Sequence, residues 1–145
     1  MESESEPKGK RVVAGVLVHG DSILVGWRKD GKCDFPGGKA EMGEDLDSAV
    51  VREYDEETGI RVVPGRILDV SEHDYGGDVG LVRVHFIECR AEGSVVLKEE
   101  RYREVYKKVD FVKITEAPKL DWLEADKQFV RDLAVAVTGS HSSMN

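Results

Sequence analysis

Apolar residues gather in five segments of the chain, in patterns that predict β-strands. The β-branched runs at residues 11–18 and 23–27 flank the polar segment HGDS, which is typical of a hairpin turn. Residues 66–75 and 79–89 lie on either side of GGD, another turn signal, and residues 109–114 form a further apolar run. We therefore predict a strand at each of these segments.

Two other segments have the periodicity of helices. Residues 46–58 follow Asp45, a good N-cap, and precede Gly59, which suits the left-handed conformation that ends many helices. The last segment carries apolar side chains at helical spacing, namely Phe129, Val130, Leu133, Ala134 and Val137. Strands on both sides of a central helix, with a second helix last, indicate an α/β domain with a mixed sheet between helices.

The length of the chain limits how these elements are grouped. A chain of 145 residues can bury one good hydrophobic core but is too short for two ordinary domains. We expect a single domain at residues 10–138. The polar residues 1–9 and 139–145 are predicted to be flexible tails.

The charge of the chain restricts its partners. The 29 acidic and 21 basic side chains give a net charge of −8, which repels polyanions and argues against long nucleic acid as a ligand. A small anion such as a nucleotide would need metal ions or a local basic cluster. The most basic stretch contains Arg28, Lys29, Lys32 and Lys39, and a triphosphate would be steered there.

The cysteines and the first residues bear on the cellular compartment. Cys33 and Cys89 form neither a disulfide framework nor a zinc spacing, so we expect both to be packing residues. The segment MESESEPKGKR is charged where a secretory signal would be apolar, and no apolar run approaches membrane-spanning length. A reducing cytoplasm fits best, with no membrane partner.

The end of the helix at residues 46–58 is unusually acidic. Continuing the apolar stripe of Ala49 and Val50 along the helix places Glu53 and Glu57 on the inward face, with Glu56 beside them. One interpretation is a solvated acidic helix end. However, these carboxylates repel one another and lie at the helix C-terminus, where the dipole favours cations. A divalent cation would resolve both conflicts, and oxygen ligands favour Mg²⁺ or Mn²⁺ over Zn²⁺.

The spacing of fixed residues around this helix resembles the signature of the Nudix hydrolases. The matching residues are Gly38, Glu44, Arg52, Glu53, Glu56, Glu57 and Gly59. Tyr54 stands where that family usually has an aliphatic residue, so we expect a packing adjustment there. The resemblance implies an α/β/α sandwich and Mg²⁺-dependent cleavage of a nucleoside diphosphate linked to a further group.

The resemblance also implies roles for individual residues. Glu53, Glu56 and Glu57 correspond to the metal-binding and base-supplying glutamates, and Gly38 lies beside them as a backbone ligand. Glu44 would support the cluster and Arg52 would orient it. A further, downstream ligand is common in the family, and the candidates here are Glu99, Glu100 and Glu104. A solvated charged loop is the alternative for those three residues.

Segments outside the signature add a substrate hypothesis. FPGGK, VRVHF and DWLEAD are similar to segments of the MutT-type nucleoside triphosphate pyrophosphohydrolases. In such proteins the start of the last helix faces the base, where Asp126 could accept hydrogen bonds from cytosine or guanine. Alternatively, Asp126 complements the first turn of the helix. Phe35 would stack on the base or belong to the core. Residues Arg28, Gly37, Gly38 and Lys39 would contact phosphate.

Together these patterns predict an enzyme that hydrolyses a nucleoside triphosphate to the monophosphate and pyrophosphate. Candidate substrates are 8-oxo-dGTP and (d)CTP-like nucleotides, with sanitation of the nucleotide pool as the role. Two alternatives stay open. One is hydrolysis of ADP-ribose, a nucleotide sugar or a dinucleoside polyphosphate, and the other is a catalytically silent nucleotide-binding module. A monomer or a homodimer would fit any of these functions.

Overall fold

A computed structural model describes residues 10–142. A seven-stranded sheet forms the centre of the molecule. Its strands are β1 (Lys10–His19), β2 (Ser22–Arg28), β3 (Cys33–Asp34), β4 (Gly37–Lys39), β5 (Val62–Asp74), β6 (Leu81–Ala91) and β7 (Tyr106–Lys113). The helices are α1 (Leu46–Thr58), α2 (Glu99–Tyr102) and α3 (Glu124–Ser142), with a 3₁₀ turn, η2, at Ala117–Lys119.

Strand β1 joins the two parts of the sheet. Strand β1 pairs in parallel with β6 from Lys10 to Leu17, and the short strand β4 pairs antiparallel with its other edge at residues 12–14. Its last residues, Val18 and His19, pair with Ile23 and Ser22 of β2, which confirms the predicted hairpin. Strand β2 then pairs with β3 and β7, and β5 closes the other edge beside β6. The sheet is therefore mixed, as predicted.

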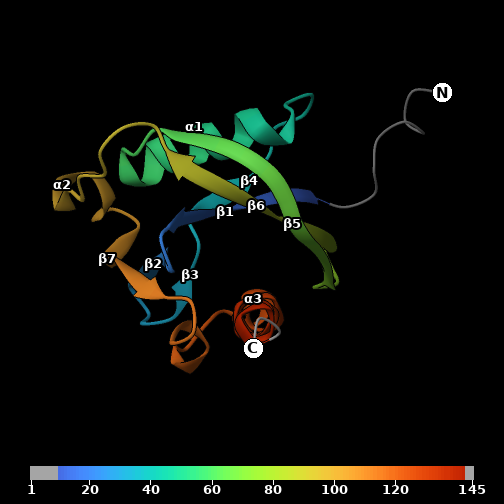
Figure 1. The fold of residues 1–145 in the computed structure, drawn as a ribbon. Helices are drawn as coiled ribbons and strands as arrows, with labels where there is room; N and C mark the ends of the chain where they lie inside the picture. The colour runs from blue at the N-terminus through green and yellow to red at the C-terminus, as the bar shows by residue number, and fades with distance from the viewer. Residues whose placement is uncertain (1–9, 143–145) are drawn as a thin grey trace.

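The two long helices cover opposite faces of this sheet. Figure 1 shows α1 on one face and α3 on the other, which confirms the expected α/β/α sandwich. Each interface has its own apolar core. The core beneath α1 includes Leu17 and Val50, and the core beneath α3 includes Phe86 and Phe129. Within residues 10–142, no helix has the length and apolar character needed to cross a membrane.

Local signals fix both ends of α1. At its start, Asp45 Oδ1 accepts a hydrogen bond from the backbone N–H of Ser48 at 2.7 Å. At its end, Gly59 has φ of 77° and donates its N–H to the carbonyl of Asp55. These contacts satisfy backbone groups that the helix leaves unpaired, so the helix occupies the predicted residues 46–58.

The expected packing adjustment at Tyr54 is found on β1. The Tyr54 side chain is fully buried, and its ring lies against Gly15 of the strand below. A Cβ atom on Gly15 would approach Tyr54 Cε2 to 2.6 Å, which is a steric clash. Gly15 therefore provides the space that the large ring of Tyr54 requires.

Some predicted boundaries are wrong. Strand β5 begins at Val62 instead of residue 66, because its position at the edge of the sheet tolerates Pro64 and the irregular pairing beyond it. Helix α3 continues to Ser142, so residues 139–142 of the predicted C-terminal tail are helical; Gly139 weakens a helix without stopping it as proline would. Residues 1–9 and 143–145 of the predicted tails lie outside the described part of the chain.

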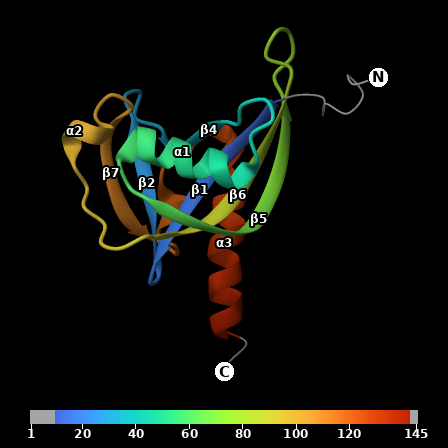
Figure 2. The same cartoon turned by 90° about the horizontal axis from the view of Figure 1, so that it is seen from above.

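The apolar face of α3 is shorter than predicted. Phe129 and Val130 are buried against the sheet, and Leu133 and Ala134 are partly buried. Val137 is 36% exposed, although it has the same helical spacing. Figure 2 shows the reason, because the C-terminal part of α3 extends past the edge of the sheet.

Candidate active site

The short strand β4 brings the chain close to the acidic end of α1. A Cβ atom on Gly37 would lie 2.0 Å from the carbonyl oxygen of Val13, and one on Gly38 would lie 2.6 Å from the carboxylate of Glu53. Only glycine permits both approaches, because any side chain would collide with backbone or with the glutamate. The glycine pair therefore places backbone directly against Glu53, as predicted for a ligand-binding loop.

Arg52 organises the glutamates of the signature. Its guanidinium binds both carboxylate oxygens of Glu44, with Nε–Oε2 and Nη2–Oε1 distances of 2.8 and 2.9 Å. Nη1 also donates to Glu53 at 3.2 Å and to Glu56 at 3.3 Å, while Nη2 reaches the carbonyl of Lys39. The hydrogen bonds from Arg52 lower the pKa of Glu44 to about 2. Glu44 thus holds Arg52, and Arg52 contacts two glutamates of the signature, while the functional roles expected for both residues stay predictions.

Glu57 lies deeper than the other glutamates of the helix. Its Oε1 atom accepts the backbone N–H of Gly37 at 3.0 Å and lies 3.5 Å from the hydroxyl of Tyr106. Burial raises the pKa of Glu57 to about 8, and the negative charges of Glu53 and Asp34 add to the shift. Burial also raises the pKa of Glu53, although Arg52 opposes that shift. The surrounding protein thus offsets only part of the cost of a negative charge on Glu53 or Glu57.

The residues fit a divalent metal ion in their chemistry. Glu53, Glu56 and Glu57 offer only oxygen ligands, and Arg52 is the cation that contacts two of them. However, the described residues contain no group of three or more acidic, histidine or cysteine side chains gathered closely enough to hold a metal. Arg52 draws Glu53 and Glu56 to itself, and Glu57 binds Gly37 instead. The predicted ligands are therefore neighbours but do not converge on one point in this conformation.

A pocket of about 470 Å³ opens beside Glu57. Arg28, the last residue of β2, and Lys29, from the turn after it, line the pocket together with Asp30 and Asp34. Arg28 pairs with Asp30 at 3.3 Å. Two members of the basic stretch thus lie next to the acidic helix end, as the steering hypothesis requires. Lys32 does not line the pocket, because its Nζ lies 3.3 Å from the carboxylate of Asp121.

Asp34 is a candidate residue that the sequence did not reveal. Its Oδ1 atom is buried and has no hydrogen-bond partner among the described residues. Burial raises its pKa to about 6. Asp126 is only 6% exposed, and its pKa is raised to about 7, first by burial and then by the charge of Asp34. The partly buried Asp34 and the buried Asp126, from distant parts of the chain, therefore lie near enough for their charges to interact, and each has a weakened tendency to ionise.

Phe35 has the surroundings of a core side chain. It is 4% exposed, and its ring lies 4.7 Å from the ring of Trp122, 6.1 Å from Phe86 and 5.8 Å from Phe129 between centroids. These surroundings fit the alternative that Phe35 belongs to the core. Stacking of Phe35 on a base stays a prediction.

Helix α2, which contains Glu99 and Glu100, lies against the end of α1, and Glu104 follows in the turn after it. Arg101 makes the contact, since its Nη2 donates to the carbonyl of Asp55 at 3.1 Å and its guanidinium lies over Gly59. Glu99, Glu100 and Glu104 are all exposed around it. None is drawn into the glutamate cluster, so the choice among them stays open.

Comparisons with known proteins identify the family of the chain. The family model for the NUDIX domain matches residues 9–133. The protein named "Putative 8-oxo-dGTP diphosphatase 2" from Mycobacterium tuberculosis is 31% identical over 140 residues, covering 92% of this chain and 94% of that protein. A "MutT-like protein" from Streptomyces ambofaciens is 36% identical over 96 residues, covering 65% of this chain and 60% of that protein.

Solved structures share the fold of this chain. The Escherichia coli ORF135 protein superposes with a TM-score of 0.73 at 22% identity, covering 90% of this chain and 93% of that one. The chain belongs to the Nudix family, and within that family it is a MutT-like hydrolase. Enzymes of this family use divalent metal ions and act on small nucleotides.

Proposed function

We propose that the protein is a Mg²⁺-dependent nucleoside triphosphate pyrophosphohydrolase that releases the nucleoside monophosphate and pyrophosphate. The observation that carries the proposal is the pocket that Arg28 and Lys29 line together with Glu57 and two aspartates. A triphosphate needs cationic groups next to the hydrolytic centre, and in this acidic chain the basic stretch meets the glutamate cluster at that pocket.

Glu53, Glu56 and Glu57, with the backbone of Gly38, would hold the metal, which Mn²⁺ could replace. When bound, the metal would supply positive charge to the phosphate oxygens. Glu53 is the candidate to orient and deprotonate the attacking water, because burial already raises its pKa. Arg52 holds Glu53 and Glu56 in place through its hydrogen bonds, and Glu44 fixes Arg52.

The base would be recognised at Asp126. An ionised Asp126 accepts hydrogen bonds from the amino group of cytosine or from the N1 and N2 edge of guanine. With its pKa raised to about 7, Asp126 is partly protonated near neutral pH and can also donate to a carbonyl of the base. The name of the mycobacterial relative adds support for an oxidised guanine nucleotide such as 8-oxo-dGTP, and a (d)CTP-like nucleotide is the other candidate.

A nucleotide panel with Mg²⁺ tests the proposal, with products separated by chromatography. It should contain 8-oxo-dGTP, dGTP, dCTP, 5-methyl-dCTP, ADP-ribose and a diadenosine polyphosphate. We expect monophosphate and pyrophosphate from one of the triphosphates. Glu53→Gln and Glu57→Gln should each lower kcat by at least about a hundredfold. Glu116→Gln changes an exposed glutamate paired with Lys119 and serves as the matched control.

Other outcomes would point elsewhere. Cleavage of ADP-ribose or the diadenosine compound in preference to every triphosphate would favour hydrolysis of a nucleotide with a second large head group. Thermal stabilisation by Mg²⁺ and a nucleotide, without turnover of any compound, would indicate a binding module. Full activity of both glutamine variants at saturating Mg²⁺ would disprove the assignment of the glutamates.

A further inference from the structure

A second pocket, also of about 470 Å³, lies at the C-terminal ends of the parallel strands β1 and β6. It shares no lining residue with the pocket beside Glu57. The two strands pair as far as Leu17 and Cys89, after which β1 turns away to pair with β2. The space opens where the strands separate. The carboxyl ends of parallel strands are a common location for ligands, since the backbone there diverges and leaves a crevice.

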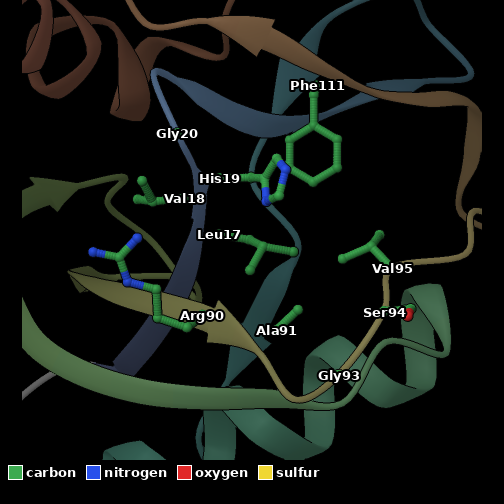
Figure 3. A pocket seen from close by; sticks show the side chains of 10 residues that line it. All are labelled: Leu17, Val18, His19, Gly20, Arg90, Ala91, Gly93, Ser94, Val95 and Phe111. Carbon is green, nitrogen blue, oxygen red and sulfur yellow. The ribbon is translucent and has the colours of Figure 1, made fainter.

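The walls of this pocket are suited to a flat apolar group. Leu17 is buried at its base, and the partly buried side chains of Val95 and Phe111 lie around the same space (Figure 3). The rings of His19 and Phe111 lie 5.7 Å apart between centroids at an angle of 50°. The volume falls within the range of roughly 300–1,000 Å³ that is usual for small-molecule sites. A planar ring would thus find apolar contact on several sides.

The charge of the lining differs from that of the whole chain. The chain has 29 acidic and 21 basic residues, yet the lining contains Arg90 and His19 and no aspartate or glutamate. Arg90 is also incompletely neutralised. Its guanidinium lies 3.5 Å from Glu88, and Arg66 approaches the same carboxylate at 3.5 Å. One carboxylate shared by two arginines leaves excess positive charge at the pocket.

We propose that this pocket binds a small planar molecule that carries a negatively charged group. The ring would pack on Leu17 beside the His19 and Phe111 rings, and the anion would pair with Arg90. The site is separate from the glutamate cluster, so this proposal does not depend on the identity of the nucleotide that is hydrolysed.

The test is an NMR titration of the ¹⁵N-labelled full-length protein with 2-naphthoate and with the uncharged 2-naphthamide. Changes in backbone amide chemical shift caused by 2-naphthoate should cluster at residues 17–20 and 90–95. The affinity for 2-naphthamide should be lower by about tenfold or more. Arg90→Gln should weaken 2-naphthoate binding by about the same factor and leave 2-naphthamide unaffected. Arg83→Gln is the matched control, because Arg83 lies on the same strand and pairs with Glu72 but does not line the pocket.

Several results would overturn the proposal. These are an absence of shifts, shifts confined to the pocket of Arg28 and Glu57, or equal affinity for the acid and the amide. Equal weakening by Arg83→Gln and Arg90→Gln would show that general surface charge, and not this pocket, attracts the anion.

Discussion

Replacing Asp126 by asparagine is expected to stabilise the protein at alkaline pH and not at acidic pH. Asp126 is buried near Asp34, and its pKa rises from the usual 3.8 to about 7 on folding. Between these values the folded protein keeps a proton that the unfolded chain has lost. The free energy of unfolding therefore falls as the pH rises through this window. Asparagine has nearly the same shape but never carries the charge.

The size of the effect follows from the same two values. One pH unit within the window corresponds to about 1.4 kcal/mol. From about pH 4.5 to about pH 8, Asp126→Asn should therefore gain at most about 3 kcal/mol of unfolding free energy relative to the wild type. Urea denaturation of both proteins at the two pH values measures this difference, with all other titrating groups common to both proteins.

Asp132→Asn is the control, because Asp132 is exposed on the same helix and should change stability by a similar amount at both pH values. An equal change in unfolding free energy at the two pH values for Asp126→Asn would refute the argument that ionisation of the buried Asp126 destabilises the wild type at alkaline pH. Activity measured on the same variant tests a separate matter, which is the contact of Asp126 with the base.

Three further changes probe the catalytic helix and its surroundings. Tyr54→Phe removes a buried hydroxyl that has no hydrogen-bond partner within residues 10–142, so the free energy of unfolding in urea should rise by about 1 kcal/mol. A fall in that free energy would contradict the absence of a partner. Gly38→Ala should abolish turnover while the protein stays folded by circular dichroism, because the new Cβ would displace Glu53; wild-type kcat would contradict this. Arg101→Gln should cost about 0.5–1 kcal/mol in thermal unfolding because it removes a cation from the end of α1. Arg103→Gln, also exposed, is its control and should have no such effect.

The sequence predicts best those features whose causes are local. Helix α1 has its predicted ends because Asp45 and Gly59 act on backbone groups within one turn. The hairpin of β1 and β2 was likewise predictable, because a short turn joins the two strands. The relation of Arg52 to Glu56 follows from helical spacing, and the structure contains that contact.

Features that depend on distant segments were not predictable in the same way. Asp34 and Asp126 come together because Cys33 of β3 pairs with Trp122, just before α3, and nothing near Asp34 in the sequence marks it as partly buried. The glutamates were expected to converge on a metal, but the sequence does not reveal how Arg52 divides its hydrogen bonds among them. The positions of side-chain hydrogen bonds are set by the packed structure and not by spacing alone.

The contact between Tyr54 and Gly15 restricts the order in which these two positions can change during evolution. A chain with alanine at position 15 could not accept tyrosine at position 54, because the methyl group would occupy the space of the ring. While tyrosine remains at position 54, a change of Gly15 to alanine should be penalised. The two positions should behave epistatically, so that Gly15→Ala costs less stability once Tyr54 is replaced by leucine. Val50 Cγ2, 3.0 Å from the same Cβ position, would still limit how far the cost falls.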